Sequence, residues 1–510
     1  MTIRFTKSWN GYYEGQIVSN PAGGNTEAQL IALGYAVSDL DGPDNSFELA
    51  KFATDSSGNV TGLVGPGGER YGFDGYQTPG VSVEGVTSFG LLDQLQSGEF
   101  VCVDTDNGDW CRKLFLFTGN PLTKAGTITP LALTSVTAGN ALLSSTGATL
   151  TFNAATKIVN AWATSNGDIY YLSFDTTLHN YLWRAKAGTY TVGSDAGYSN
   201  KRACLDVGLH GGVHSTNIRS LSHRTFLEAK VAGVSHLYFC EYNVNGSRTA
   251  GSGGAGADQA IVWRSTDNGN TWTVFFEFNT GGSHQIAHFH GAVQDPYTGW
   301  IYFMVGDFTT EPAIIGYNGT AAAVAANTSL STIATTAGYK VIYGTELARY
   351  CDLCFSEYGI FSIPDADAEG ADTTTTAFVS TLLPRTLDYI VSKSPVTRST
   401  NVPPVIAVQG PDYALFASFI TSGADSSQHH IWSADSKTGG WTLVAKIKNQ
   451  AGSGTYVPAN LFIDKTNPKN VWLSFGFAQG GYVTAASQSG SSVLLKLTQR
   501  GSVVTYAATS

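Results

Sequence analysis

Apolar and polar residues alternate along many short segments of the chain, and turns rich in Gly, Asn, Asp and Pro separate these segments. Alternation is the pattern of a half-buried β-strand, because successive side chains of a strand point to opposite faces. From about residue 100 onward, pairs of such segments recur roughly every 50 to 60 residues. The repeating units lie at residues 158–192, 236–278, 288–308, 353–370, 405–447 and 459–504. The pattern predicts an all-β chain made of repeated small antiparallel sheets.

One turn between two of these strands carries the most specific motif of the chain. Residues 265–272 read STDNGNTW, with Ser265, Asp267, Gly269, Thr271 and Trp272 at the spacing SxDxGxTW. Asp and Asn side chains hydrogen-bond nearby backbone, and Gly adopts positive φ without steric cost, so the segment predicts a hairpin. This hairpin resembles the Asp box of sialidase-type β-propellers. In that family the motif is architectural and performs no chemistry itself.

Two further segments are similar to the motif. Residues 433–441 repeat its Ser, Asp, Gly and Trp with one extra residue and without the threonine, and residues 104–111 read DTDNGDWC, one residue short. A single blade cannot bury both faces of its sheet, so closure of the ring is needed to complete the core. We expect residues 101–510 to form a β-propeller of about six blades, and five or seven blades also fit the repeat.

The first hundred residues differ in character from the rest. Residues 1–42 combine a short extended piece, a Pro-Gly-Gly turn and a helix that begins near Thr26 and stops at Gly34, which predicts a small α+β module. Residues 43–100 are rich in turn residues and show no long helix or strand pattern. We interpret them as a connector.

The start of the chain also resembles modules near the start of bacteriophage structural proteins. The resemblance rests on NGYYEGQIVSNPAGGNTEAQLIALGYA at residues 10–36 and on GNVTGLVGPGG at residues 58–68. It implies that residues 1–42 dock onto a virion and that the propeller is displayed outward. A host-encoded protein with a generic turn-rich leader is the alternative.

Composition narrows the classes of partner. Only 13% of the residues are charged, 58 are Gly, and the formal net charge is −10 with a pI near 5.4. Because phosphate binding needs a basic patch, we expect no nucleic-acid partner and no anionic-membrane partner. The sequence shows no secretory signal and no apolar run long enough to span a bilayer, which favours a soluble protein made in a cytosol.

The cysteines give no sign of a disulfide scaffold. There are six of them, at positions 102, 111, 204, 240, 351 and 354, and we interpret them as buried free thiols. Cys351 and Cys354 form a CxxC pair, which would suit half of a zinc site or a redox pair, but no second pair lies nearby. We therefore expect no metal and no cofactor.

Enzymatic activity is not expected from the residues present. A sialidase, as its family implies, needs three arginines, a Tyr-Glu nucleophile pair and an aspartate acid/base. The first arginine belongs to an early Arg-Ile-Pro phrase, whereas here Ser362 precedes Ile363 and Pro364. A glycosidase that uses two carboxylates is the enzymatic alternative, and no pair stands out among Asp206, Glu228, Glu241, Asp295, Asp307, Glu346, Asp352 and Glu357. No catalytic residue is predicted.

Three polar residues are the candidates for facing a ligand. His288 and His290 alternate with Phe289, so both imidazoles are expected on one face of a strand, where they could ligate a metal or line the central channel. A hydrogen-bonded pair within the channel wall is the structural alternative. Asp295 begins the DPYTG turn of the same unit.

These observations favour a virion structural protein of the tail-fibre or spike type, assembled in the host cytoplasm. Its partners would be other virion proteins, contacted through the N-terminal region, and a glycan or protein of the host surface. A virion-associated glycan hydrolase and a purely structural tail or decoration protein are the alternatives. A homo-oligomer would suit a fibre, although the sequence shows no coiled-coil pattern.

Overall fold

The chain divides into two compact units, Met1–Phe73 and Asp74–Ser510, and each is described by itself. The computed structural model describes residues 2–5, 17–19, 36–38, 51–54, 60–64, 70–72, 89–104, 114–122, 125–131, 136–137, 149–150, 157–174, 180–188, 190, 201–207, 209–210, 213–214, 218–219, 223–243, 260–278, 286, 288–306, 312–324, 328–343, 350–356, 359–364, 376–377, 380–382, 396–397, 405–409, 414–420, 428–435, 441–448, 458–468, 470–475, 493–500 and 503–508. Within them, no helix is long and apolar enough to cross a membrane.

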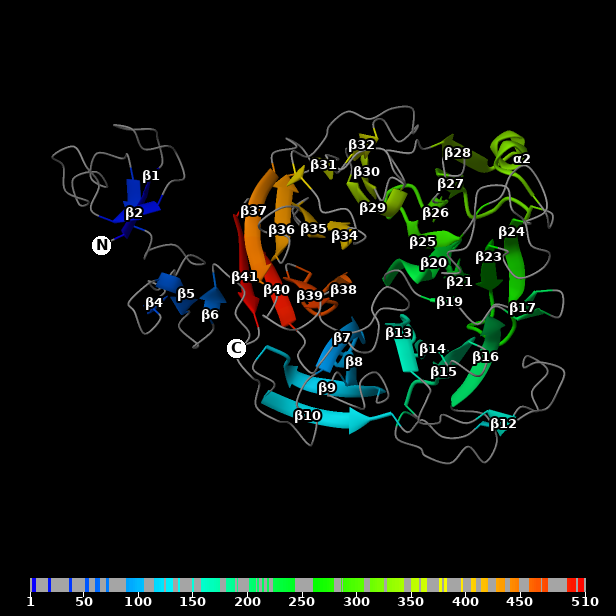
Figure 1. Ribbon diagram of the computed structural model, residues 1–510, viewed down its shortest axis with the longest axis horizontal. Helices are drawn as coiled ribbons and strands as arrows, with labels where there is room; N and C mark the ends of the chain where they lie inside the picture. The colour runs from blue at the N-terminus through cyan, green and yellow to red at the C-terminus, as the bar shows by residue number, and fades with distance from the viewer. Residues whose placement is uncertain are drawn as a thin grey trace. The chain divides into compact units, whose positions relative to one another are not determined.

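The first unit contains two antiparallel sheets of three short strands (Figure 1). One sheet has the order β2 (Ile17–Ser19), β1 (Thr2–Phe5), β3 (Ala36–Ser38), and the other has the order β4 (Lys51–Thr54), β5 (Val60–Val64), β6 (Arg70–Gly72). The second sheet lies in the segment that we interpreted as a connector. Its strands are too short to leave a long alternating pattern, so the sequence did not predict them. The helix predicted near Thr26 lies outside the described residues.

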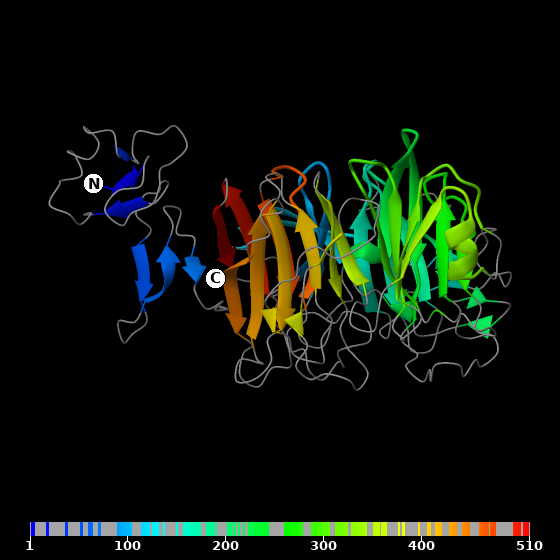
Figure 2. The ribbon, with the colours of Figure 1, turned by 90° about the horizontal axis from the view of Figure 1, so that it is seen from above.

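The second unit is a β-propeller, which confirms the predicted fold class. In the part of this unit that the structure describes, seven antiparallel sheets follow one another along the chain, six with four strands and one with three. Their first strands surround a common centre, so each sheet is one blade of a ring (Figure 1). The side view shows the strands running along the axis of that ring (Figure 2). Seven blades fall within the expected range of five to seven.

The blades are numbered in chain order. Blade 1 comprises β7 (Phe89–Gln94), β8 (Phe100–Asp104), β9 (Leu114–Asn120) and β10 (Ala125–Pro130); blade 2 comprises β13 (Lys157–Ala163), β14 (Ile169–Phe174), β15 (Asn180–Ala185) and β16 (Lys201–Val207). Blade 3 comprises β20 (Phe226–Val231), β21 (Val234–Cys240), β23 (Ala260–Ser265) and β24 (Thr273–Phe278); blade 4 comprises β25 (Phe289–Gln294), β26 (Ile301–Val305), β27 (Ala313–Tyr317) and β28 (Tyr339–Tyr343). Blade 5 comprises β29 (Tyr350–Ser356), β30 (Gly359–Pro364) and β32 (Ser380–Leu382); blade 6 comprises β34 (Val405–Gln409), β35 (Ala414–Ile420), β36 (Gln428–Asp435) and β37 (Trp441–Lys448). Blade 7 comprises β38 (Pro458–Ile463), β39 (Asn470–Phe475), β40 (Val493–Arg500) and β41 (Val503–Ala508).

Smaller elements lie between and within the blades. Two-stranded sheets pair β11 (Val136–Thr137) with β12 (Thr149–Leu150), β17 (Leu209–His210) with β18 (Val213–His214), β19 (Ile218–Arg219) with β22 (Tyr242–Asn243), and β31 (Thr376–Ala377) with β33 (Val396–Thr397). The 3-10 helix η1 (His223–Thr225) precedes blade 3, and helix α2 (Leu330–Thr335) lies between the last two strands of blade 4. The Ser329 side chain caps α2 by accepting from the Thr332 N–H.

The first blade was not among the predicted repeat units. Its first strand, β7, reads FGLLDQ and is buried along its whole length. A strand that is buried on both faces shows a continuous apolar run instead of alternation, so the periodicity does not reveal it. The propeller therefore begins before the expected boundary at residue 101.

The hydrophobic core is a series of interfaces between neighbouring blades. One cluster joins blades 1 and 2 and includes Leu116, Tyr171 and Trp183; the next joins blades 2 and 3. A third cluster, rich in aromatic rings, joins blades 3 and 4, and a fourth joins blades 4 and 5. Blades 1 to 5 thus bury apolar side chains against their neighbours, as expected of a fold in which a single blade has no core of its own.

Within the described residues, the first and last blades share no sheet. Every described strand of blade 1 comes from residues 89–130, and every described strand of blade 7 comes from residues 458–508. Hydrogen bonds link the two blades instead: Leu91 N–H donates to Ser474 Oγ at 3.0 Å, Asn460 Nδ2 donates to the Leu92 carbonyl at 2.9 Å, and Lys465 N–H donates to Gln94 Oε1 at 2.6 Å. Closure therefore depends on polar side chains that bridge the two ends of the propeller.

A register shift recurs on the first strand of six blades, and it places polar residues at the centre. In blades 1, 2, 5 and 7 the residue that resumes pairing after the shift is Asp93, Asn160, Asp352 and Asn460, respectively. Blades 4 and 6 carry a shift at the corresponding strand. In three cases the side chain accepts the next backbone N–H, at 2.7–2.8 Å. Bulges of this kind redirect side chains, and in these four blades the residue after the shift is polar.

The hairpin predicted at residues 265–272 forms between β23 and β24. Ser265 Oγ accepts the Gly269 N–H at 2.8 Å, and the Asp267 carboxylate accepts the Thr271 N–H at 2.8 Å and the Thr271 hydroxyl at 2.6 Å. Gly269 has φ of +73°. The indole of Trp272 packs against the cluster between blades 2 and 3. The five motif residues therefore build the hairpin and its contact with the preceding blade.

The two similar segments have different positions in the fold. Residues 433–441 connect β36 to β37, which are the third and fourth strands of blade 6, as β23 and β24 are of blade 3. Residues 104–111 follow β8 and precede β9, the second and third strands of blade 1, so they do not occupy the equivalent turn. Residues 105–113 and 436–440 lie outside the described residues.

Replacing Gly269 with alanine should destabilise the propeller through a clash between blades. A Cβ at this position would lie 2.5 Å from Tyr170 Oη, and Tyr170 is fully buried in blade 2. We expect Gly269→Ala to lower the free energy of unfolding by about 1 to 2 kcal/mol for the positive φ and by about a further 1 to 3 kcal/mol for overpacking. Urea unfolding measures the total.

Gly299→Ala is the matched control, because Gly299 has φ of +75° and nothing within 4 Å of its added Cβ. It should show the φ penalty alone. Equal losses for the two variants would contradict the docking of the hairpin onto Tyr170.

Candidate functional site

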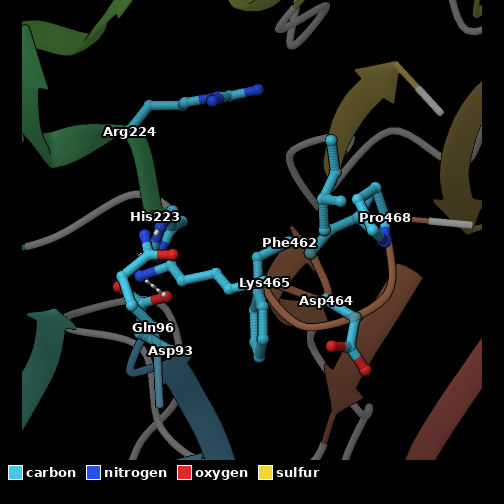
Figure 3. A pocket seen from close by; sticks show the side chains of 10 residues that line it. Asp93, Gln96, His223, Arg224, Phe462, Asp464, Lys465 and Pro468 are labelled. Carbon is cyan, nitrogen blue, oxygen red and sulfur yellow. Dashed lines mark ion pairs between the residues drawn. The ribbon is translucent and has the colours of Figure 1, made fainter. Parts of the chain in front are cut away.

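A pocket of about 380 Å³ opens between blade 1, η1 and blade 7 (Figure 3). It lies at the end of the ring where the first two strands of a blade are joined, since it includes residues of the β7–β8 and β38–β39 turns. Its volume is at the small end of the ~300–1,000 Å³ typical of ligand sites. The lining residues are Asp93, Gln96, His223, Arg224, Leu461, Phe462, Ile463, Asp464, Lys465 and Pro468.

Asp93 is the hub of the polar contacts in this pocket. Its Oδ1 accepts the Gln94 N–H at 2.7 Å and lies 3.0 Å from Lys465 Nζ, and its Oδ2 accepts the Ala163 N–H at 2.7 Å. The His223 Nε2 lies 3.9 Å from the same Oδ2. Asp93 therefore joins blade 1 to blade 2, to η1 and to blade 7, and both of its oxygens are in use.

Lys465 is held by partners on two other blades. Besides Asp93, its ammonium donates to the Ala163 carbonyl of blade 2 at 3.0 Å, and its backbone N–H donates to Gln94 of blade 1. An ammonium has three N–H donors, so two are committed to the ring. Lys465 is thus fixed in position with its side chain 21% exposed at the pocket.

His223 lies against Asp93 and against the Phe462 ring, 6.0 Å away between centroids. Its carbonyl accepts the Trp162 indole N–H at 2.7 Å, which anchors η1 on blade 2. Burial lowers the pKa of His223 from 6.5 to about 4; Asp93 opposes this effect, while Arg224 and Lys465 add to it. The imidazole is therefore neutral at pH 7.

Arg224 pairs with Asp352 of blade 5, with Nε 3.0 Å from Oδ1. Burial raises the pKa of Asp352 to about 6 even though Arg224 favours its charged form. η1 can approach blade 4 because residue 291 is glycine: a Cβ there would lie 2.6 Å from the Arg224 Cβ and carbonyl oxygen. In Figure 3 the Arg224 side chain extends over the opening from the η1 side.

Asp464 is occupied by its own turn. Its Oδ1 accepts the N–H groups of Thr466 and Asn467 and the Thr466 hydroxyl, and its Oδ2 accepts the Trp472 indole N–H at 2.9 Å. These hydrogen bonds hold the pKa of Asp464 below its usual value despite the opposing effect of burial. Figure 3 shows the carboxylate turned away from Lys465. Asp464 shapes the β38–β39 turn and stays charged.

The predicted histidine pair lies elsewhere, at the start of β25. The rings of His288 and His290 have centroids 5.1 Å apart, and the Tyr242 ring lies 4.0 Å from His288. The two histidines are 5% and 0% exposed. They are close together, as expected from their spacing, but they are packed inside the propeller and do not line the pocket.

Asp295, the third candidate for facing a ligand, belongs to a turn and does not line the pocket. The residue is fully buried, and its carboxylate accepts the Tyr297 N–H at 2.9 Å and the Thr298 hydroxyl at 2.7 Å. It stabilises the β25–β26 turn as Asp464 stabilises the β38–β39 turn. An aspartate at the first position of such a turn serves local backbone, which is the common role of Asp in turns.

The remaining sequence candidates do not form a second cluster. Within the described residues, no group of three or more His, Cys, Asp or Glu side chains is arranged to hold a metal. The Glu228 carboxylate accepts a hydrogen bond from the Ser165 hydroxyl, and the Glu241 carboxylate accepts one from the Trp263 indole N–H. Four cysteines are buried and free, as interpreted: Cys102, Cys204, Cys240 and Cys354.

Sequence reasoning missed the residues that the pocket brings together. Asp93 stands alone as a charged residue in an apolar run, which is a signal of a paired buried group. Lys465 sits in a polar turn and has no such signal. His223 and Arg224 are adjacent in the sequence, but nothing there places them beside Asp93.

No family model matches the sequence, and no curated protein matches it. Several solved structures are similar in fold. A prolyl endopeptidase gives a TM-score of 0.44 at 11% identity over 83% of this chain and 50% of that chain, and a GH74 enzyme from Niastella koreensis gives 0.44 at 13% identity over 85% and 55%. A lectin from Aleuria aurantia gives 0.34 at 11% identity over 74% and 99%. This chain spans about half the length of the first two chains, and similarity at this level concerns the fold alone.

The low pKa of His223 predicts a loss of stability in acid. As the pH falls below 6.5, the unfolded chain binds a proton at this residue while the folded protein does not until about pH 4. Wild type should therefore lose about 2 to 3 kcal/mol from this group between about pH 7 and pH 4.5. His223→Asn should lack that contribution, as measured by urea unfolding at both pH values.

Asp352→Asn is the comparison variant, because Asp352 should change the stability with pH in the direction opposite to His223. Because the pKa of Asp352 is raised from 3.8 to about 6, the folded state binds the extra proton in that window and loses the associated stability as the pH rises. If wild type and His223→Asn show the same dependence on pH, His223 is not held neutral by the fold.

Proposed function

We propose that this protein is a bacteriophage virion protein of the tail-fibre or spike type, and that its propeller binds a host-surface glycan without cleaving it. The supporting observation is the state of the carboxylates at the pocket. Hydrolysis of a glycosidic bond needs two carboxyl groups, one as acid and one as nucleophile or base. Asp93 and Asp464 are instead bound to backbone, hydroxyl, indole and ammonium donors.

The shape and chemistry of the pocket support binding. It is a concave site with apolar walls from Leu461, Ile463 and Pro468 and with convergent polar groups, which is the usual composition of a small-ligand site. Its polar groups are held by hydrogen bonds from several blades, so they are positioned before a ligand arrives. Such preorganisation reduces the entropy lost on binding.

The virion assignment rests on the resemblance of the first residues to phage structural modules. The division of the chain after Phe73 supports it, because a compact first unit is available as the part that docks onto other virion proteins. A glycan hydrolase is the rival function. Asp307 and Glu346, two of the carboxylates that such an enzyme could use, lie outside the described residues.

Removing residues 1–73 should separate the two parts of the proposal. On an array of bacterial surface polysaccharides, the full chain and the truncated chain should bind the same glycans, and neither should generate new reducing ends. In particles assembled with the truncated gene product, mass spectrometry should find the propeller missing. The heat-unfolded protein is the control for nonspecific binding.

Each outcome bears on one part of the proposal. Release of new reducing ends would replace the binding function with hydrolysis. Truncated propeller on purified particles would remove the docking role of the first unit. An array on which the full chain binds nothing would contradict the glycan-binding role.

A further inference from the structure

The groups that a ligand meets in the pocket are mainly hydrogen-bond donors. The side chains of Lys465, Arg224 and His223 are 19–21% exposed, whereas the Asp93 side chain is 3% exposed. Asp464 is 6% exposed, and both of its oxygens already accept hydrogen bonds. The acids thus serve the scaffold, and positive charge is presented at the surface of the pocket.

Lys465 is the residue best placed to bind an acceptor. Its contacts with Asp93 Oδ1 and the Ala163 carbonyl fix the ammonium and use two of its three N–H donors. The third donor remains for a ligand. A charged donor that is already fixed forms a strong hydrogen bond to an anionic oxygen, because no side-chain freedom is lost at that moment.

The neighbours of Lys465 suit a single sugar ring with an acid group. Arg224, which pairs with Asp352, contributes a second positive charge, and the neutral His223 ring lies beside Phe462 at the wall of the pocket. The exposed Gln96 side chain stands at the rim in the β7–β8 turn, and the apolar wall can meet the C–H face of the ring.

We infer that this pocket binds the carboxylate of an acidic sugar residue, a hexuronate, with Lys465 as its charged donor. The inference rests on the proposed glycan-binding function and adds the class of glycan. A hexuronate is negatively charged, and so is the protein, whose formal net charge is −10. Recognition therefore depends on the positively charged side chains at the pocket and not on the net charge of the protein.

Charge changes at Gln96 test the inference without disturbing the ring, because the Gln96 side chain is exposed and belongs to a turn. The probe is tri-galacturonate, compared with its fully methyl-esterified form, and binding to the full chain is measured by isothermal titration calorimetry. Wild type should bind the acid at least tenfold more tightly than the ester. Gln96→Lys should tighten binding of the acid roughly two- to fivefold, and Gln96→Glu should weaken it by a similar factor.

Lys465→Met and Lys340→Met form a second pair of variants, and they change the net charge of the protein by the same amount. Lys465→Met should abolish binding of tri-galacturonate, whereas Lys340→Met should leave it unchanged, because Lys340 lies over the Trp300 ring in blade 4. If Lys465→Met fails to fold, the Gln96 variants still decide the question.

Equal affinity for the acid and the ester would overturn the inference, and so would unchanged affinity in both charged Gln96 variants. Failure of tri-galacturonate to bind, together with binding of neutral glycans on the array, would also overturn it while leaving the proposed function in place. Failure of every glycan would remove the proposed function itself.

Discussion

The propeller depends on hydrogen bonds between its two ends. A ring of blades gains its core only when the last blade meets the first, and none of the described strands is shared between these two blades. Blade 1 and blade 7 are joined by side chains that bond backbone groups of the opposite blade, through Ser474, Asn460 and Gln94. Because these groups are buried or half-buried, leaving any of them unpaired would cost about 1 to 3 kcal/mol. Closure therefore stabilises the propeller and also fixes how blade 1 and blade 7 align with each other.

The same constraint produces the pocket. Bulges on the first strands turn polar side chains toward the centre, where Asp93 links three other segments of the ring. Asp93 and Asp464, the two carboxylates that line the pocket, accept hydrogen bonds from the scaffold. The side chains that are left for a ligand there are donors, and the proposed binding function rests on this arrangement.

The sequence predicted those features that depend on local chemistry. The SxDxGxTW spacing specifies a hairpin in which Ser265, Asp267, Gly269 and Thr271 are joined by hydrogen bonds, and the turn-flanked segments at 288–308 and 459–504 form paired strands. Features that depend on the ring were missed. β7 is buried on both faces, so its sequence does not alternate. The bulges have no recognisable sequence pattern. Asp93, His223 and Lys465 meet only because blade 1, η1 and blade 7 lie around one centre. The turn contacts of Asp295 could not be told from the sequence, because a turn aspartate and a ligand-facing aspartate look the same there.

Amide hydrogen exchange at the junction of blades 1 and 7 tests the account most directly. The Leu91 N–H donates to Ser474 Oγ and the Lys465 N–H donates to Gln94 Oε1, so both amides are protected only while the ring is closed. They should exchange as slowly as the core amides of β14 in blade 2. Fast exchange at Leu91 and Lys465 alongside protected β14 amides would contradict closure by these polar bridges.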